Sequence, residues 1–129
     1  MSTTGTTSGQ LDVEMLRRAI EARDAAAQVA MFAPDAELIM VDQAHPPSMP
    51  EEVRGTAAIR ARLEDICARD MTHKVMRMVS GPGSAAYTVA CRYADGTQVR
   101  SAMMLDVGDD GLIMRQEGVQ AWDESGAGA

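Results

Sequence analysis

The sequence predicts a single α+β domain in which a cone-shaped, strongly curved antiparallel sheet wraps around N-terminal helices and leaves an internal pocket. Three observations predict this class. Apolar residues recur at helical spacing near the start of the chain and again in its middle. Four strand-like runs separated by short turn sequences follow. The length of 129 residues suits one hydrophobic core and not two.

The first element is a bent helical hairpin. Apolar side chains at helical spacing form one face of its first helix: Leu11, Met15, Leu16, Ala19 and Ile20. Asp12 and Glu14 stand at its start, where the helix dipole favours negative charge. A second helix is predicted over residues 25–32. We expect Ala-Pro-Asp at 33–35 to end it, because the residue before a proline is pushed out of the α region.

A strand, a loop and a third helix come next. The short apolar run at 37–41 predicts a buried strand. Residues 42–55 contain three prolines and predict a loop with at most one short turn. Thr56 is the predicted N-cap of the last helix, which has one apolar face formed by Ile59, Leu63, Ile66 and Cys67.

Four strands complete the chain, at residues 72–80, 85–94, 97–107 and 112–122. They are rich in Val, Met, Tyr and Thr, and a turn sequence separates each from the next. Asp95-Gly96 is a strong hairpin signal between two of them. The four strands predict an antiparallel meander.

Composition excludes several classes of partner. The formal net charge of −7 disfavours nucleic acids and anionic membranes, both of which need a basic surface. No apolar run has the length of a membrane span. Residues 1–10 predict a disordered arm without signal-peptide features, and 124–129 a flexible tail, which leaves 11–123 as the domain. Cys67 and Cys91 have no CxxC spacing and predict two buried thiols, consistent with a reducing cytoplasm.

Three short segments, together with this order of elements, carry a resemblance to a known family. They are Phe32-Ala-Pro-Asp-Ala36, Gly55 before the third helix, and Asp110-Gly-Leu-Ile113 opening the last strand. The chain resembles the SnoaL-like branch of the nuclear transport factor 2-like superfamily over nearly the whole folded part. The resemblance implies a cystatin-like cone with an internal pocket and dimerisation through the sheet. Its members include isomerases, polyketide cyclases, epoxide hydrolases, dehydratases and non-catalytic binding proteins.

The resemblance also allows two catalytic patterns to be tested. The ketosteroid isomerase pattern would place its general-base Asp at Met40, its oxyanion-hole Asp at Met103 and its Tyr near Leu16 or Arg17. Methionine can neither take a proton nor donate a hydrogen bond, so that mechanism is not expected. The epoxide hydrolase pattern fails because Ala102, not Asp, follows Arg100 by two residues. The cyclase type, which needs one acid or base in an apolar cavity, stays open.

Alternation along the last strand predicts which residues line the pocket. Met114, Gln116, Gly118 and Gln120 share one face, and we expect Leu16, Met40, Met103 and Trp122 to join them in the lining. If the register slips by one residue, Glu117 turns inward and becomes a general acid or base with a raised pKa. Otherwise Glu117 forms a surface pair with Arg115.

Strand 85–94 offers a second candidate. Its residues alternate between two faces, with Tyr87, Val89, Cys91 and Tyr93 on one and Thr88, Ala90 and Arg92 on the other. The alternation alone leaves open which face lines the cavity. Facing inward, Arg92 would be a buried cation able to bind an enolate, a carboxylate or a developing oxyanion. Facing outward, it would be an ordinary surface or interface arginine.

The remaining candidates are an aspartate and two histidines. Asp42 would lie at the pocket mouth as a proton acceptor if the strand runs that far, or would cap its own loop. His45 would be a lid residue or a solvated loop residue. His73 begins a strand and is compatible with either face. With two histidines and no paired spacing, no metal site is predicted.

These observations favour a cofactor-independent enzyme that performs isomerisation, cyclisation or dehydration by proton transfer on a hydrophobic carbonyl compound. No dinucleotide motif, P-loop or nucleophile elbow is found in the sequence. The alternative is a non-catalytic domain that binds a small ligand. In either case a small hydrophobic molecule and a homodimer are expected, in the cytoplasm, without nucleic acid or membrane.

Overall fold

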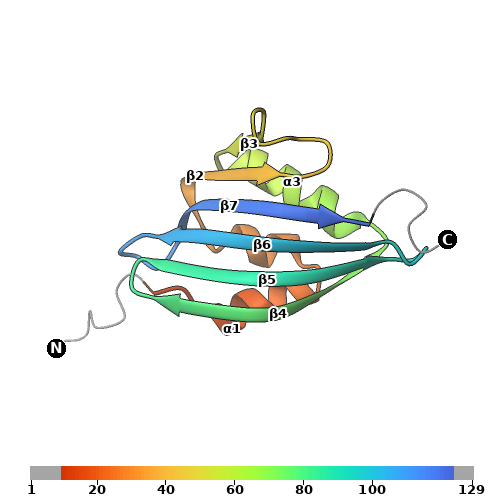
Figure 1. The fold of residues 1–129 in the computed structure, drawn as a ribbon. Coiled ribbons are helices and arrows are strands. Elements are labelled where there is room, and N and C mark those ends of the chain that lie inside the picture. Colours follow the sequence, from red (N-terminus) through yellow and green to blue (C-terminus); the bar gives the residue numbers. More distant parts are fainter. Residues whose placement is uncertain (1–9, 124–129) are drawn as a thin grey trace.

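The computed structural model describes residues 10–123, in which helices cover one face of a curved six-stranded sheet (Figure 1). The predicted α+β class is confirmed. The elements are α1 (Val13–Glu21), α2 (Ala25–Val29), β2 (Phe32–Val41), β3 (Glu51–Arg54), α3 (Thr56–Ala68), β4 (Met71–Gly81), β5 (Ser84–Tyr93), β6 (Gln98–Val107) and β7 (Ile113–Trp122). The predicted arm, apart from Gln10, and the predicted tail lie outside the described residues. Within residues 10–123 no helix is long and apolar enough to cross a membrane.

The strands follow the order β3-β2-β7-β6-β5-β4. The last four form the predicted antiparallel meander. β2 joins it by pairing parallel to β7. Parallel neighbours need a long crossover, and here α3 and the first three strands of the meander supply it. The backbone N–H of Ile113 donates to the carbonyl of Met31 (2.8 Å), which aligns the beginnings of β2 and β7.

The second helix is shorter than predicted, and the predicted stop at 33–35 is wrong. α2 ends at Val29, and Phe32 and the Ala-Pro-Asp sequence lie in β2. Two contacts override helix propensity there: the carbonyl of Met31 accepts from β7, and Phe32 is buried in the core. Pro34 is tolerated because the β2–β7 register is irregular between Phe32 and Glu37, and because β3 pairs with residues 37–40 alone.

The predicted loop at 42–55 contains the edge strand β3, which the sequence analysis missed. Four residues pair antiparallel with β2, ending at Arg54 opposite Glu37. The N-cap of α3 is Gly55, and not Thr56 as predicted. The N–H of Gly55 donates to the carbonyl of Ala36 (2.9 Å), which leaves Gly55 at φ 89° and ψ 158°, a conformation that suits glycine. The hydroxyl of Thr56 donates instead to the carbonyl of Pro34 (3.3 Å).

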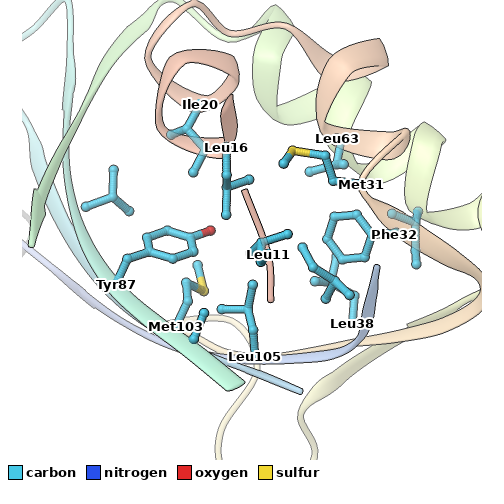
Figure 2. Packing of buried hydrophobic residues seen from close by; sticks show 14 of the residues in the cluster. Leu11, Leu16, Ile20, Met31, Phe32, Leu38, Leu63, Tyr87, Met103 and Leu105 are labelled. Atoms are coloured by element: carbon cyan, nitrogen blue, oxygen red, sulfur yellow. The ribbon is translucent and has the colours of Figure 1, made fainter. Parts of the chain in front are cut away.

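The core lies between the helices and the inner face of the sheet (Figure 2). Leu16 and Ile20 come from α1, while Tyr87, Met103 and Leu105 project from the sheet. β6 alternates strictly between exposed and buried residues, as the sequence predicts for a strand with one covered face. The inner face of the meander therefore forms the floor of whatever space the helices leave open.

Candidate functional site

A cavity of about 80 Å³ lies between the inner face of the sheet and the helices. Apolar side chains dominate its wall, among them Leu38, Met40, Leu63, Ile66, Val89 and Met103. Its polar lining includes His73, Tyr87, Ser101, Gln116 and Gln120. An apolar hollow with a few convergent polar groups is the usual form of a small-molecule site.

Strand register brings the cavity residues into rows across the sheet. Met40, Gly118, Met103 and Tyr87 are successive partners on β2, β7, β6 and β5. Gln120, Ser101 and Val89 form the next row on β7, β6 and β5. Because each row contributes a polar group, the floor of the cavity is mixed in character although its walls are apolar.

Tyr87 and Gln116 form a buried polar pair on this floor. The burial of Tyr87 raises its pKa well above the ordinary value, the nearby Cys91 adds to the rise, and a hydrogen bond with Gln116 opposes it. Tyr87 therefore stays a neutral hydroxyl that can donate a hydrogen bond. The amide of Gln116 donates to Sδ of Met103 (3.6 Å). Figure 2 shows the hydroxyl end of Tyr87 pointing into the space between the sheet and α1.

His73 faces Cys91 across strands β4 and β5, and both line the cavity. The Nδ1 atom of His73 lies 3.1 Å from Sγ of Cys91, and its Nε2 atom is buried with no hydrogen-bond partner among the described residues. Burial lowers the pKa of His73, and the charge of Arg23 lowers it further. Burial raises the pKa of Cys91 to about 11. Both groups are therefore neutral at pH 7, and the imidazole can accept a proton.

A charged pair closes another part of the wall. Oε1 of Glu51 accepts a hydrogen bond from Nε of Arg62 (3.1 Å) and lies 3.1 Å from Nη2 of the same guanidinium in an ion pair. Arg62 also contacts Asp65 (3.3 Å). Because the two charged residues of the cavity wall neutralise each other, the site favours an uncharged ligand. The sequence pattern does not indicate this pair, because Glu51 lies in a segment that predicts a loop and Arg62 is not among the residues of the apolar face of its helix.

Asp42 and His45 pair with each other and do not line the cavity. The carboxylate of Asp42 accepts from the backbone N–H of Ala44 (2.9 Å) and contacts Nδ1 of His45 (2.9 Å). Burial acts to raise the pKa of Asp42, but these hydrogen bonds outweigh it and lower the pKa. Of the two positions considered for Asp42, the pocket mouth is excluded and the other matches the structure: its side chain organises the loop that follows β2.

This loop and the first residue of β3 together carry a group of potential metal ligands. One ligand atom each from Asp42, His45 and Glu51 lie within 4.8 Å of one another. The guanidinium of Arg62 already holds Glu51, and its positive charge opposes a cation at that place. The donor set is thus of the right type for a divalent metal, but its surroundings do not fit one.

Glu117 and Arg92 both lie on the exposed outer face of the sheet. Glu117 contacts Arg115 (3.8 Å), so the register without a slip holds. The inner face of β5 is the one that carries Tyr87 and Cys91, which leaves Arg92 outside. The inward positions considered for both residues are corrected, because alternation directs their side chains away from the helices.

Three positions in the expected pocket lining are also corrected. Met114 is 49% exposed because the register shifts at this point: Ile113 pairs with Val107 and Arg115 with Asp106. Leu16 is buried in the core but does not line the cavity. Trp122 packs against Tyr93 (ring centroids 5.8 Å apart) and donates to Oε1 of Gln120 (3.0 Å), so it supports a lining residue from outside.

The remaining expected residues line the cavity: Met40, Met103, Gln116, Gln120 and His73. Tyr87, Ser101 and Cys91 join them, although the sequence analysis did not assign them to the site. The alternation of strand 85–94 contained the signal for Tyr87 and Cys91. Choosing the correct face required knowing where the helices pack.

Comparisons with known proteins agree on the fold. The sequence matches the SnoaL-like domain family over residues 13–116. No curated protein matches the sequence. A putative ketosteroid isomerase from Kribbella flavida superposes with a TM-score of 0.68 at 21% identity, over 88% of this chain and 76% of that one.

Two further solved structures are similar to the chain. One is a Mycobacterium tuberculosis protein in complex with estradiol-17β-hemisuccinate, with a TM-score of 0.63, 21% identity, and coverage of 82% and 87%. The other is the epoxide hydrolase/cyclase-like enzyme SalBIII of salinomycin pyran ring formation, with a TM-score of 0.66, 19% identity, and coverage of 84% and 87%. At these identities the similarity shows a shared fold, whereas the chemistry of this chain depends on the residues of its own cavity.

Proposed function

The chain belongs to the SnoaL-like family, and on this premise we propose that it is a cofactor-independent enzyme that transfers a proton on a small hydrophobic carbonyl compound. The reaction is of the isomerase, cyclase or dehydratase type. One observation carries the proposal: a neutral, half-buried histidine, whose Nε2 atom is buried, lines the same small apolar cavity as three neutral hydrogen-bond donors, Tyr87, Ser101 and Gln116.

In this proposal His73 is the general base. Its lowered pKa keeps the imidazole unprotonated at neutral pH, which is the form that removes a proton. When Nδ1 carries the hydrogen and donates it to Cys91, Nε2 holds the free lone pair. The other candidate acids and bases, Asp42 and Glu117, do not line the cavity.

Removing a proton next to a carbonyl places negative charge on the carbonyl oxygen, and the proposal assigns its stabilisation to the cavity floor. Tyr87 and Gln116 lie there as neutral donors in surroundings that exclude water. Ser101, which is 2% exposed, adds a hydroxyl in the neighbouring row. Such donors stabilise charge strongly because the cavity has a low dielectric constant.

The alternative is a non-catalytic ligand-binding domain, and the methionine-rich wall favours it. The two functions differ in what happens to the protons of a bound ketone. A ketone that only binds keeps the hydrogens next to its carbonyl, whereas a proton-transfer site exchanges them with solvent. Deuterium uptake from D₂O, followed by NMR, therefore separates the two functions.

The test compares the wild type with His73→Gln and His45→Gln. The second variant is a matched control, because His45 lies outside the cavity. We expect the wild type to exchange the α-protons of a cyclic ketone with solvent. The exchange rate should fall about 100-fold or more in His73→Gln and stay at the wild-type value in His45→Gln. Full exchange by His73→Gln would refute the assigned base. Binding without exchange by the wild type would favour the binding domain.

We also propose that two copies of the chain associate through the outer face of the sheet. Two exposed apolar side chains project from this face, Met104 (66% exposed) and Val119 (56% exposed). Their cross-strand partners include the small residues Ala86 and Ala102. Charged residues such as Glu117 and Arg92 share this face with them, and exposed apolar side chains among charged ones are of the kind that association buries.

A further inference from the structure

We propose that Gly118 determines the size of the ligand, and that it restricts the cavity to uncharged carbonyl compounds no larger than a single ring. The inference rests on the proposed function in taking this cavity as the substrate site and a carbonyl compound as the substrate. It concerns how two methionine side chains share the space above one glycine.

Gly118 lies between two methionines in the sheet. Met40 is its partner on β2, and Met103 is its partner on β6. A Cβ atom at position 118 would lie 3.0 Å from both Sδ and Cε of Met40, and would overlap Sδ of Met103. Both thioethers therefore occupy the volume that a side chain at position 118 would fill.

The backbone of this residue does not require glycine. Gly118 is not among the glycines with positive φ, so an alanine could adopt its conformation without strain. The missing side chain matters because of space. With any larger residue at this position, Met40 and Met103 would have to move. Because the sheet lies behind them, they would move into the cavity.

Met103 is also held where it lies. Its Sδ atom accepts the hydrogen bond from the buried amide of Gln116 (3.6 Å). The cavity that remains measures about 80 Å³, whereas sites for drug-sized ligands measure roughly 300–1,000 Å³. A ligand with several fused rings would have to displace Met103 and break this contact, so the position of Met103 over Gly118 selects against large ligands.

The cavity wall also selects by charge. Glu51 and Arg62 neutralise each other, and the remaining polar groups are hydroxyl, amide, imidazole and thiol groups that are neutral at pH 7. An ionised ligand would find no unpaired opposite charge there. The ligand class is therefore a small neutral ketone, aldehyde or enol.

The test measures equilibrium binding of three ketones of increasing size: cyclohexanone, 2-decalone and progesterone. Five variants are compared with the wild type: Gly118→Ala, Met103→Ala, the double variant of both, and the matched controls Gly81→Ala and Met49→Ala. An added Cβ at Gly81 meets nothing within 4 Å, and Met49 is 74% exposed and does not line the cavity. Calorimetric titration gives the Kd, and circular dichroism checks the fold of each variant.

We expect the wild type to bind cyclohexanone most tightly and progesterone not at all. We expect Gly118→Ala to bind cyclohexanone about tenfold or more weakly than the wild type, and Met103→Ala to bind 2-decalone about tenfold more tightly. Both controls should bind all three ketones as the wild type does. The double variant Gly118→Ala/Met103→Ala recovers cyclohexanone binding, because the displaced side chain is gone. A merely destabilised fold would not show this recovery.

The inference is overturned if Gly118→Ala binds all three ketones as the wild type does. It is equally overturned if the wild type prefers progesterone or binds none of the three. If Gly118→Ala does not fold, Met103→Ala decides alone, since an unchanged size preference there refutes the inference. Binding needs no turnover, so a size preference without α-proton exchange would refute the proposed function and leave this inference standing.

Discussion

The Nδ1 atom of His73 lies 3.1 Å from the Sγ atom of Cys91, its direct cross-strand partner, inside the cavity between the sheet and the helices. Burial acts on the two groups in opposite directions, lowering the pKa of the histidine and raising that of the cysteine to about 11. The pair is therefore an imidazole beside a thiol, and not an imidazolium–thiolate ion pair. This state underlies the first two predictions.

The proton-transfer rate should depend on pH through His73 alone. A general base works in its unprotonated form, and the pKa of His73 lies below the ordinary value of 6.5. We therefore expect the exchange rate, corrected for hydroxide catalysis in buffer, to be level in mildly alkaline solution and to fall with acidification, with its midpoint at a lower pH than the ordinary value of 6.5. Measuring the rate of α-proton exchange as a function of pH tests this expectation. A rate that rises further between pH 7 and 9 would point to a different base.

The two thiols should differ in reactivity in the folded protein. At pH 8 roughly one thousandth of Cys91 is thiolate, and the residue is buried. Cys67 also has a pKa raised by burial, but it is half-buried. We expect a thiol reagent to modify Cys67 first in the native state, and both at similar rates in denaturant.

Peptide mapping by mass spectrometry identifies the modified residue, and Cys67→Ser and Cys91→Ser serve as single-thiol controls. Faster modification of Cys91 in the native protein would mean that His73 activates it as a thiolate. The neutral form of the pair, and with it the role of His73 as a free base, would then be wrong.

Gly55→Ala should destabilise the protein by about 1–3 kcal/mol, because φ 89° and ψ 158° lie in a region that alanine adopts only with strain. Space is not the cause, since an added Cβ would meet only the carbonyl of Pro34 at 4.0 Å. Urea denaturation measures the free energy of unfolding. Gly81→Ala is the control and should change it by less than about 0.5 kcal/mol. Equal stability of both variants would contradict the argument.

The proposed dimer predicts that charge on the outer sheet face separates the subunits. We expect the wild type to sediment as a dimer at micromolar concentration, and Met104→Glu/Val119→Glu to sediment as a monomer, because two further carboxylates beside Glu117 would have to be buried at a high cost. Met49→Glu, at an exposed loop position (74% exposed), is the control and should remain dimeric. A monomeric wild type, or a dimeric double variant, would exclude this interface.

Much of the fold could be predicted from local sequence patterns. Alternation and turn residues located the meander, since each strand between 71 and 122 has one buried face and glycine-containing turns join each strand to the next. Helical spacing located α1 and α3, which pack one apolar face each. Two features were not predicted from local patterns. β3 forms because it pairs with the edge of β2, and α2 ends before the predicted residue 32 because the N–H of Ile113 in β7 binds the carbonyl of Met31.

The candidate site was predicted less completely. Alternation put Gln116 and Gln120 on one face, and both line the cavity, but the shift in register at Met114 could not be read from it, because such a shift depends on pairing with β6. The sequence pattern allowed His73 to lie on either face of the sheet, and it predicted a loop at Glu51. In each case the deciding contact joins residues far apart in the chain.

The sequence by itself determined the α+β class, the meander and the apolar character of the enclosed space, because these follow from the spacing of side chains along single elements. Tertiary structure decided which ionisable groups enter that space: His73 lines it, Asp42 turns to its own loop, and Glu117 and Arg92 stay outside. The physical reason is that the orientation of a side chain follows from strand register and helix packing, whereas its pKa follows from the burial that results.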